Sequence, residues 1–191
     1  TASNTAITGP VLLADNITIQ NDKATSSKFL DFRGNWSSET AGLKTITVTG
    51  NSAGRTTFNA TTASISDGAG QVAITQASAT TPLQLYSVNT YTGGTRITNG
   101  GTVAITADTG LGAASSTLTF NNGTLSYIPA VAGAILARDI ALESGGGTIS
   151  LSTSTTNNTV NATGNISGVG GLTKTGSAAL TLSGINTYEG G

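Results

Sequence analysis

The sequence predicts an all-β chain whose short parallel strands wind into a β-solenoid, or parallel β-helix, of about eight or nine coils. The first observation is a phrase, Asn-Thr-Tyr-x-Gly-Gly, which occurs at Asn89 and again at Asn186 and indicates that one structural unit is used twice. The second is a short-range alternation of apolar and small or polar residues, typical of strands with one buried face. The third is the abundance of corner formers, because 26 glycines and several Asn clusters separate the alternating spans.

Ten apolar triplets carry the alternation, and each predicts a strand. In chain order they are Ile17–Ile19, Ile46–Val48, Val72–Ile74, Leu83–Leu85, Val103–Ile105, Leu118–Phe120, Leu125–Tyr127, Ile140–Leu142, Ile149–Leu151 and Leu180–Leu182. Corners are predicted between them, at Gly93–Gly94, Asn99–Gly101, Asn121–Gly123, Gly145–Gly147, Asn157–Asn158 and Gly168–Gly171. The expected number of coils follows from a period of roughly 20 to 25 residues per coil.

Short strands with frequent turns also suit a β-sandwich, but long-range repetition favours the solenoid. The segment Leu13–Ile19 resembles Leu136–Leu142, and Gly34–Ser37 resembles Gly164–Ser167. The inward triplets use mainly Ile, Leu and Val, as a thin stacked core requires. A sandwich has no reason to repeat such phrases.

The composition excludes several classes of function. Charged residues make up 9% of the chain, the net charge is −1, and the eight basic residues are scattered, so no basic patch for nucleic acid is expected. The absence of Cys and His excludes disulfides, thiolate chemistry and every His-based triad. The longest small and apolar run, Ala130–Ala137, is far shorter than the roughly 20 residues of a membrane-spanning helix.

The segment Gly168–Gly191 closely resembles the passenger-associated β-strand repeat of bacterial autotransporters. In this sequence it contains Gly-Gly-Leu-Thr-Lys, Leu-Thr-Leu-Ser-Gly and Asn-Thr-Tyr-x-Gly-Gly. The continuation of the family pattern resembles Thr95–Val103 and Gly110–Gly112. The resemblance is strong over 82–127 and 164–191 and weaker over 1–81.

The resemblance implies a right-handed parallel β-helix at the cell surface of, or outside, a Gram-negative-type bacterium. It divides the expected solenoid into regular repeats over 82–191 and a less regular segment, or an N-terminal cap, over 1–81. The division is made because Phe29–Trp36 departs from the family pattern. In the family the pattern continues with a further strand, so we expect the chain to be a piece of a longer array.

Candidate catalytic and metal sites are few. Some β-helices cleave polysaccharides with paired carboxylates, and Asp15, Asp22 and Asp31 are the densest acidic set, although solvated loop positions explain them better. Calcium-binding solenoids follow their glycines with an Asp, which Gly145–Gly147 lacks. We therefore expect no catalytic residue, no metal and no cofactor.

Two groups of residues are candidates for binding. Trp36, together with Tyr86, Tyr91, Tyr127 and Tyr188, could stack on sugar rings, but packing at the corners explains the tyrosines better, which leaves Trp36 as the candidate ligand-binding residue. The alternating threonines of Thr45–Thr49 resemble those of ice-binding solenoids, but the pattern does not recur in every coil, and an ordinary exposed strand explains it better.

The expected function is a non-enzymatic adhesin or surface scaffold. Its expected partners are a host or matrix glycan or protein, or identical chains, with no nucleic acid and no membrane span in this segment. Two alternatives remain: a structural fibre joined end to end by strand pairing, and, less favoured, a polysaccharide-cleaving β-helix.

Overall fold

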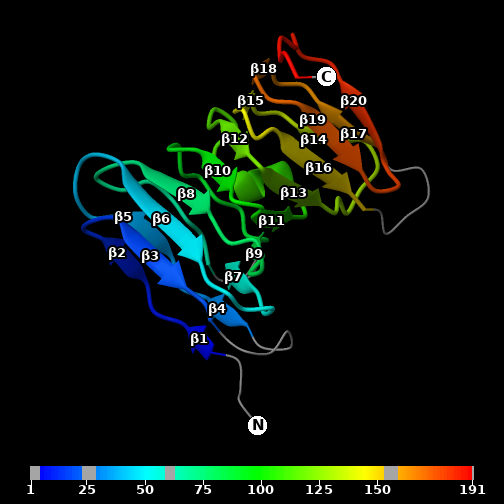
Figure 1. Ribbon diagram of the computed structural model, residues 1–191. Helices are drawn as coiled ribbons and strands as arrows, with labels where there is room; N and C mark the ends of the chain where they lie inside the picture. Colours follow the sequence, from blue (N-terminus) through cyan, green and yellow to red (C-terminus); the bar gives the residue numbers. More distant parts are fainter. Residues whose placement is uncertain (1–4, 23–28, 59–62, 153–158, 191) are drawn as a thin grey trace.

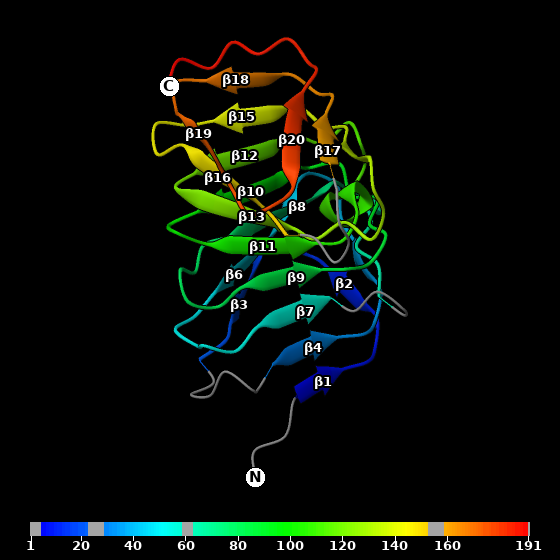
Figure 2. The same ribbon diagram turned by 90° about the vertical axis from the view of Figure 1, so that its right-hand side faces the viewer.

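The computed structural model describes residues 5–22, 29–58, 63–152 and 159–190. Every pairing between the described strands is parallel, and the chain winds upward coil upon coil from one terminus to the other (Figures 1 and 2). The predicted all-β parallel solenoid is therefore confirmed.

The strands stack on three faces. The first face holds eight strands, in the order β1 (Thr5–Ile7), β4 (Leu30–Phe32), β7 (Thr56–Phe58), β9 (Leu83–Leu85), β11 (Thr102–Ile105), β13 (Gly123–Tyr127), β16 (Gly147–Leu151) and β19 (Leu172–Thr175). The second face holds seven, namely β3 (Ile17–Gln20), β6 (Lys44–Thr49), β8 (Val72–Gln76), β10 (Thr95–Thr98), β12 (Leu118–Asn121), β15 (Ile140–Leu142) and β18 (Ile166–Gly168).

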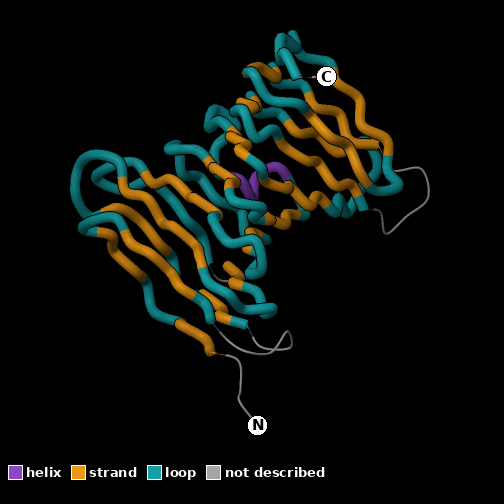
Figure 3. The backbone as a smooth tube through the Cα atoms, in the orientation of Figure 1, coloured by secondary structure: helices purple, strands orange, loops and turns teal. Residues whose placement is uncertain are grey.

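The third face is interrupted. It begins with β2 (Val11–Leu13) and β5 (Trp36–Ser38) and resumes with β14 (Ala134–Leu136), β17 (Thr159–Ala162) and β20 (Ala179–Leu182). In one of the coils between them the chain forms a short 3-10 turn, η1 (Asp108–Leu111), which is the helical segment of Figure 3. Among the described residues this turn is the only helical segment, and all other regular elements are strands.

The number of coils is slightly lower than the eight or nine expected. The seven strands of the second face are separated by six full turns of the chain. Coils near the N-terminus are longer than assumed, since Ile17 pairs with Ile46, 29 residues later, whereas Thr102 pairs with Thr124 after 22. Strands from both sides of residue 82 belong to the same stacks.

The core is a narrow column of aliphatic side chains. In each strand alternate residues point inward, and successive coils place them on top of one another, as for Val103, Leu125 and Ile149, all fully buried. Full burial of such a side chain contributes roughly 1.5–3 kcal/mol. Nearer the N-terminus Phe32 stacks on Phe58, with ring centroids 4.9 Å apart.

Close backbone contact between coils depends on glycine at two equivalent corners. A Cβ atom at Gly34 would collide with the carbonyl oxygen of Gly9, and one at Gly164 would collide with that of Arg138. The two resembling phrases Gly34–Ser37 and Gly164–Ser167 therefore perform the same structural task.

Candidate binding surface

The repeated phrase forms a corner that clamps one coil to its neighbour. The side-chain oxygen of Asn89 accepts a hydrogen bond from the backbone N–H of Ile65 (2.8 Å), and its amide nitrogen donates to the carbonyl of Gly110 (2.8 Å). The side-chain oxygen of Asn186 accepts from the N–H of Ile166 (3.1 Å). In both copies the Asn bonds to the coil before it, so the phrase encodes coil stacking.

The tyrosines serve packing. Tyr91, in the first copy, is fully buried, and its hydroxyl hydrogen-bonds with Thr95 (2.6 Å). Burial raises the pKa of the Tyr91 hydroxyl well above its ordinary value. Tyr188, its counterpart, is half-buried and packs against the core. Tyr86 is also half-buried. Tyr127 is 2% exposed. The burial of Tyr91 and Tyr127 leaves their rings no face open to a sugar.

The two copies of the phrase lie on different sides of the solenoid. Asn89 follows β9, which belongs to the first face, whereas Asn186 follows β20, which belongs to the third. A ligand site repeated along the rod would keep one orientation. The phrase therefore marks a structural corner and does not define one binding surface.

Trp36, the sequence-based candidate for ligand binding, lies in the core. It is 3% exposed, and its ring packs edge-on against Phe32 and Phe58, with centroids 4.9 and 5.3 Å away. In this position the indole has no face available to a sugar. Trp36 occupies an inward position of β5, as Ile or Leu does in other strands.

The three acidic candidates are not gathered into one site. Asp15 is exposed before β3, and Asp22 is exposed after it, where its carboxylate accepts from the N–H of Asn51 (2.9 Å). Asp31 is buried on the first face and pairs with Arg33 (2.7 Å). Among the described residues no cluster of three or more acidic side chains suitable for a metal ion occurs.

The alternating threonines of Thr45–Thr49 point outward from β6 on the second face. Thr47 lies between Thr18 and Thr75 in neighbouring strands, but the next outward position of this row is Arg96. A charged side chain therefore ends the row of hydroxyls after three coils.

A longer and uncharged array of hydroxyls lies on the first face. Thr102, Thr124, Thr148 and Thr173 pair in register across four consecutive strands. A parallel row, two residues further along each strand, contains Ala104, Ser126, Ser150 and Thr175. We call the seven hydroxyl residues of these rows the hydroxyl face.

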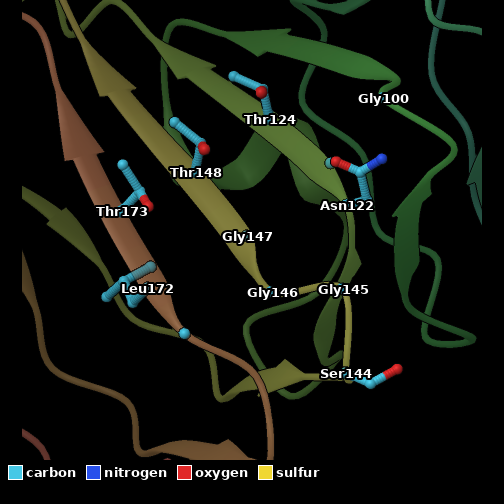
Figure 4. A pocket seen from close by; sticks show the side chains of 12 residues that line it. Gly100, Asn122, Thr124, Ser144, Gly145, Gly146, Gly147, Thr148, Leu172 and Thr173 are labelled. Atoms are coloured by element: carbon cyan, nitrogen blue, oxygen red, sulfur yellow. The ribbon is translucent and has the colours of Figure 1, made fainter. Parts of the chain in front are cut away.

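Figure 4 shows three threonines of this face side by side beside a shallow groove. The groove has a volume of about 410 Å³ and its floor is built largely from glycines of successive corners, among them Gly100, Gly145, Gly147 and Gly171. Gly146 adopts φ +63° in this turn, a conformation that favours glycine. The predicted corner at Gly145–Gly147 thus shapes the groove edge.

A second groove of about 380 Å³ crosses the second face between Leu43, Thr92 and Arg96. Arg96 forms a bidentate ion pair with Glu143, two coils away, in which Nη2 donates to Oε2 (2.7 Å). The hydrogen-bonded guanidinium lowers the pKa of Glu143 below its ordinary value, and the carboxylate raises the pKa of Arg96. Charge is therefore present on this face and already paired.

Sequence reasoning missed the hydroxyl face, although a signal was present. The dipeptide Gly-Thr opens three consecutive strand segments, at Gly101, Gly123 and Gly147, with an aliphatic residue following each Thr. Its recurrence at coil spacing would have predicted the stacked threonines. The alternating Thr45–Thr49 segment is more conspicuous and drew attention to the other face.

The stacked coils and the recurring Asn corner define a β-helical repeat protein. The family model described as the passenger-associated-transport-repeat matches residues 83–105 and 172–191, which include both Asn corners. The chain is also similar to the adhesin BmaC autotransporter of Brucella suis biovar 1 (strain 1330), with 39% identity over 109 residues.

The aligned segment covers 56% of this chain and 3% of the length of that relative. No solved structure matches. The family model and the relative confirm the autotransporter passenger class expected from the sequence, with a location at the cell surface or outside a Gram-negative bacterium. In the described part of the chain, no helix is long and apolar enough to cross a membrane.

Proposed function

We propose that this chain is a non-enzymatic segment of an adhesin passenger that attaches to external surfaces or to identical chains. The observation that carries the proposal is the rigid, uncharged hydroxyl face on a stack whose relative is named an adhesin. Stacked hydroxyls offer many weak hydrogen bonds, and many copies of a passenger on one cell convert weak contacts into firm attachment. The same display makes the chain a surface scaffold.

Attachment is tested with beads that carry the folded chain. We expect such beads to be retained on host cells, or on matrix proteins and glycans, at least several-fold more than beads carrying the same chain unfolded by urea and then washed. Equal retention of folded and unfolded chain on every surface, together with no clustering of the beads themselves, would contradict the adhesin proposal.

A second candidate function is a fibre subunit joined end to end, which is favoured by the apolar residues exposed at both ends of the stack. Ile7 pairs with the buried Phe32 yet is 40% exposed in the first coil. Leu180 pairs with the buried Val160 yet is only half-buried near the last. Unpaired parallel edges accept further strands. Electron microscopy of the purified chain distinguishes the candidates, since filaments one solenoid wide support the fibre and isolated short rods contradict it.

The polysaccharide-cleaving alternative is tested by the triple substitution of Asp15, Asp22 and Asp31 by Asn. If any glycan-cleaving activity is found in the purified chain, we expect it to be unchanged in the triple variant, since these carboxylates lie apart. Loss of such an activity in the triple variant would support the polysaccharide-cleaving alternative.

A further inference from the structure

We propose that the hydroxyl face is a self-association surface and that its partner is the hydroxyl face of a second copy of this chain. This inference rests on the proposed self-attachment and assigns it to one side of the solenoid. The contact is made by the outward residues of β11, β13, β16 and β19, and the other two faces of the solenoid take no part in it.

The spacing of the hydroxyls points to a second copy as the occupant. Parallel strands lie about 4.8 Å apart, so one row presents a hydroxyl at every step of the stack and the other at every step except Ala104. Another parallel stack has the same spacing and matches it rung by rung over its whole length. A globular surface or a flexible peptide would match at one or two rungs only.

The chemistry of the hydroxyl group makes the face complementary to itself. A hydroxyl donates one hydrogen bond and accepts others, and it rotates to suit its partner. Ser126 opposite Ser150 of the partner copy is therefore as good a pair as Thr opposite Thr. Burying these groups against each other does not leave unpaired donors, which would otherwise cost free energy.

The electrostatics allow two such faces to meet. No outward residue of the hydroxyl face is charged. Lys174 lies in β19 between Thr173 and Thr175, in register with Ile149. It is exposed in this last strand of the face, and its ammonium donates to the carbonyl of Gly176 (2.7 Å). The second face instead carries the Arg96–Glu143 ion pair, and a face-to-face contact there would have to remove these charges from water.

The area that two hydroxyl faces bury against each other indicates that attachment requires many pairs of chains. Four strands about 4.8 Å apart and roughly four residues long, at about 3.3 Å each, cover about 250 Å² per copy. The roughly 500 Å² buried by two copies is below the about 1,200 Å² of a stable interface. One pair of chains is therefore weakly bound, and attachment requires many chains on each surface.

The test uses beads densely coated with the folded chain and measures their rate of clumping. Two variants place charge at diagonal positions of the face: Thr124→Lys with Ser150→Lys, and Thr124→Glu with Ser150→Glu. We expect each variant alone to clump at least tenfold more slowly than the unmodified chain, because like charges meet. Mixing Lys beads with Glu beads should restore clumping, and high salt should abolish the restoration.

The matched control places Thr47→Lys and Ala141→Lys on the second face, where both residues are outward and half-buried. We expect these beads to clump like the unmodified chain. Recovery in the mixture also shows that both charged variants are folded.

Each remaining outcome overturns the inference. If unmodified beads clump but the Lys beads clump equally well, or the control loses as much, self-attachment stands and the assigned face is wrong. If unmodified beads do not clump but are retained on host cells, adhesion stands and self-association falls.

Discussion

Single asparagines decide how firmly adjacent coils are joined, and burial decides how much each one matters. Asn89 is 2% exposed and bonds to both the coil before and the coil after it. Asn186 is exposed and bonds to the coil before it. The same residue of the same phrase thus occupies two environments within one chain.

We predict that Asn89→Ala lowers the free energy of unfolding by about 2–4 kcal/mol, because it strands a buried N–H of Ile65 and a buried carbonyl of Gly110. Asn186→Ala should cost about 1 kcal/mol or less, since water replaces the lost amide at an exposed corner. Urea unfolding of both variants measures the difference. Equal losses would show that the corner amides are not the clamps described above.

Individual residues also show how far the sequence alone could be interpreted. The equivalence of the Gly34 and Gly164 phrases was readable, because both residues are glycine for the same steric reason. The burial of Trp36 was not, because alternation in β5 does not say which side of a strand faces inward. The inward orientation of Trp36 depends on Phe32 in β4 and Phe58 in β7, whose rings pack against the indole.

At the scale of elements, the interruption of the third face is held by one buried arginine. Arg138 follows β14, and its side chain is fully buried in contact with η1. Its Nε donates to the carboxylate of Asp108 (2.8 Å), and Nη1 and Nη2 donate to the carbonyls of Leu111 (2.8 Å) and Asp108 (2.7 Å). The guanidinium thus supplies hydrogen-bond donors to backbone carbonyls of this irregular segment.

We predict that Arg138→Ala destabilises the chain by about 3–5 kcal/mol, because it leaves Asp108 and several carbonyls without their donor. Arg96→Ala is the matched control, since it removes an exposed pair worth less than about 1 kcal/mol. Thermal and urea unfolding compare the two. A small loss for Arg138→Ala would mean that the 3-10 turn is held by its own packing.

The ten strands that the sequence predicted all carry large apolar residues at their inward positions, and several of the strands that it missed do not. All ten apolar triplets lie within strands, because Ile, Leu and Val mark the inward positions directly. β7 and β10 direct Thr56 and Thr95 inward, and β5 directs Trp36 and Ser38. Such strands form because the coils above and below them supply their pairing partners. A local sequence pattern does not show which segments those partners are.

The solenoid is stabilised by stacking, and among the described residues the first and last coils contact a neighbouring coil on one side only. β1 is exposed throughout, and β19 and β20 are exposed or half-buried, whereas β13 alternates between buried and half-buried residues. In a stack of this kind each coil contacts its neighbours only, so local stability follows the number of neighbours. With no cysteines, no disulfide ties the ends down.

We therefore predict a gradient of amide hydrogen exchange along the stack. Amides of β9, β11 and β13 should exchange most slowly, since their coils are covered on both sides, and those of β1, β19 and β20 should exchange fastest, since opening an end coil breaks contacts on one side only. Peptide-resolved exchange measured by mass spectrometry shows the gradient. Urea well below the unfolding midpoint should steepen it, because the ends open before the middle. Uniform exchange in every coil would mean instead that the solenoid opens as one cooperative unit, and independent stacking of neighbours would then be the wrong description of how it is held together.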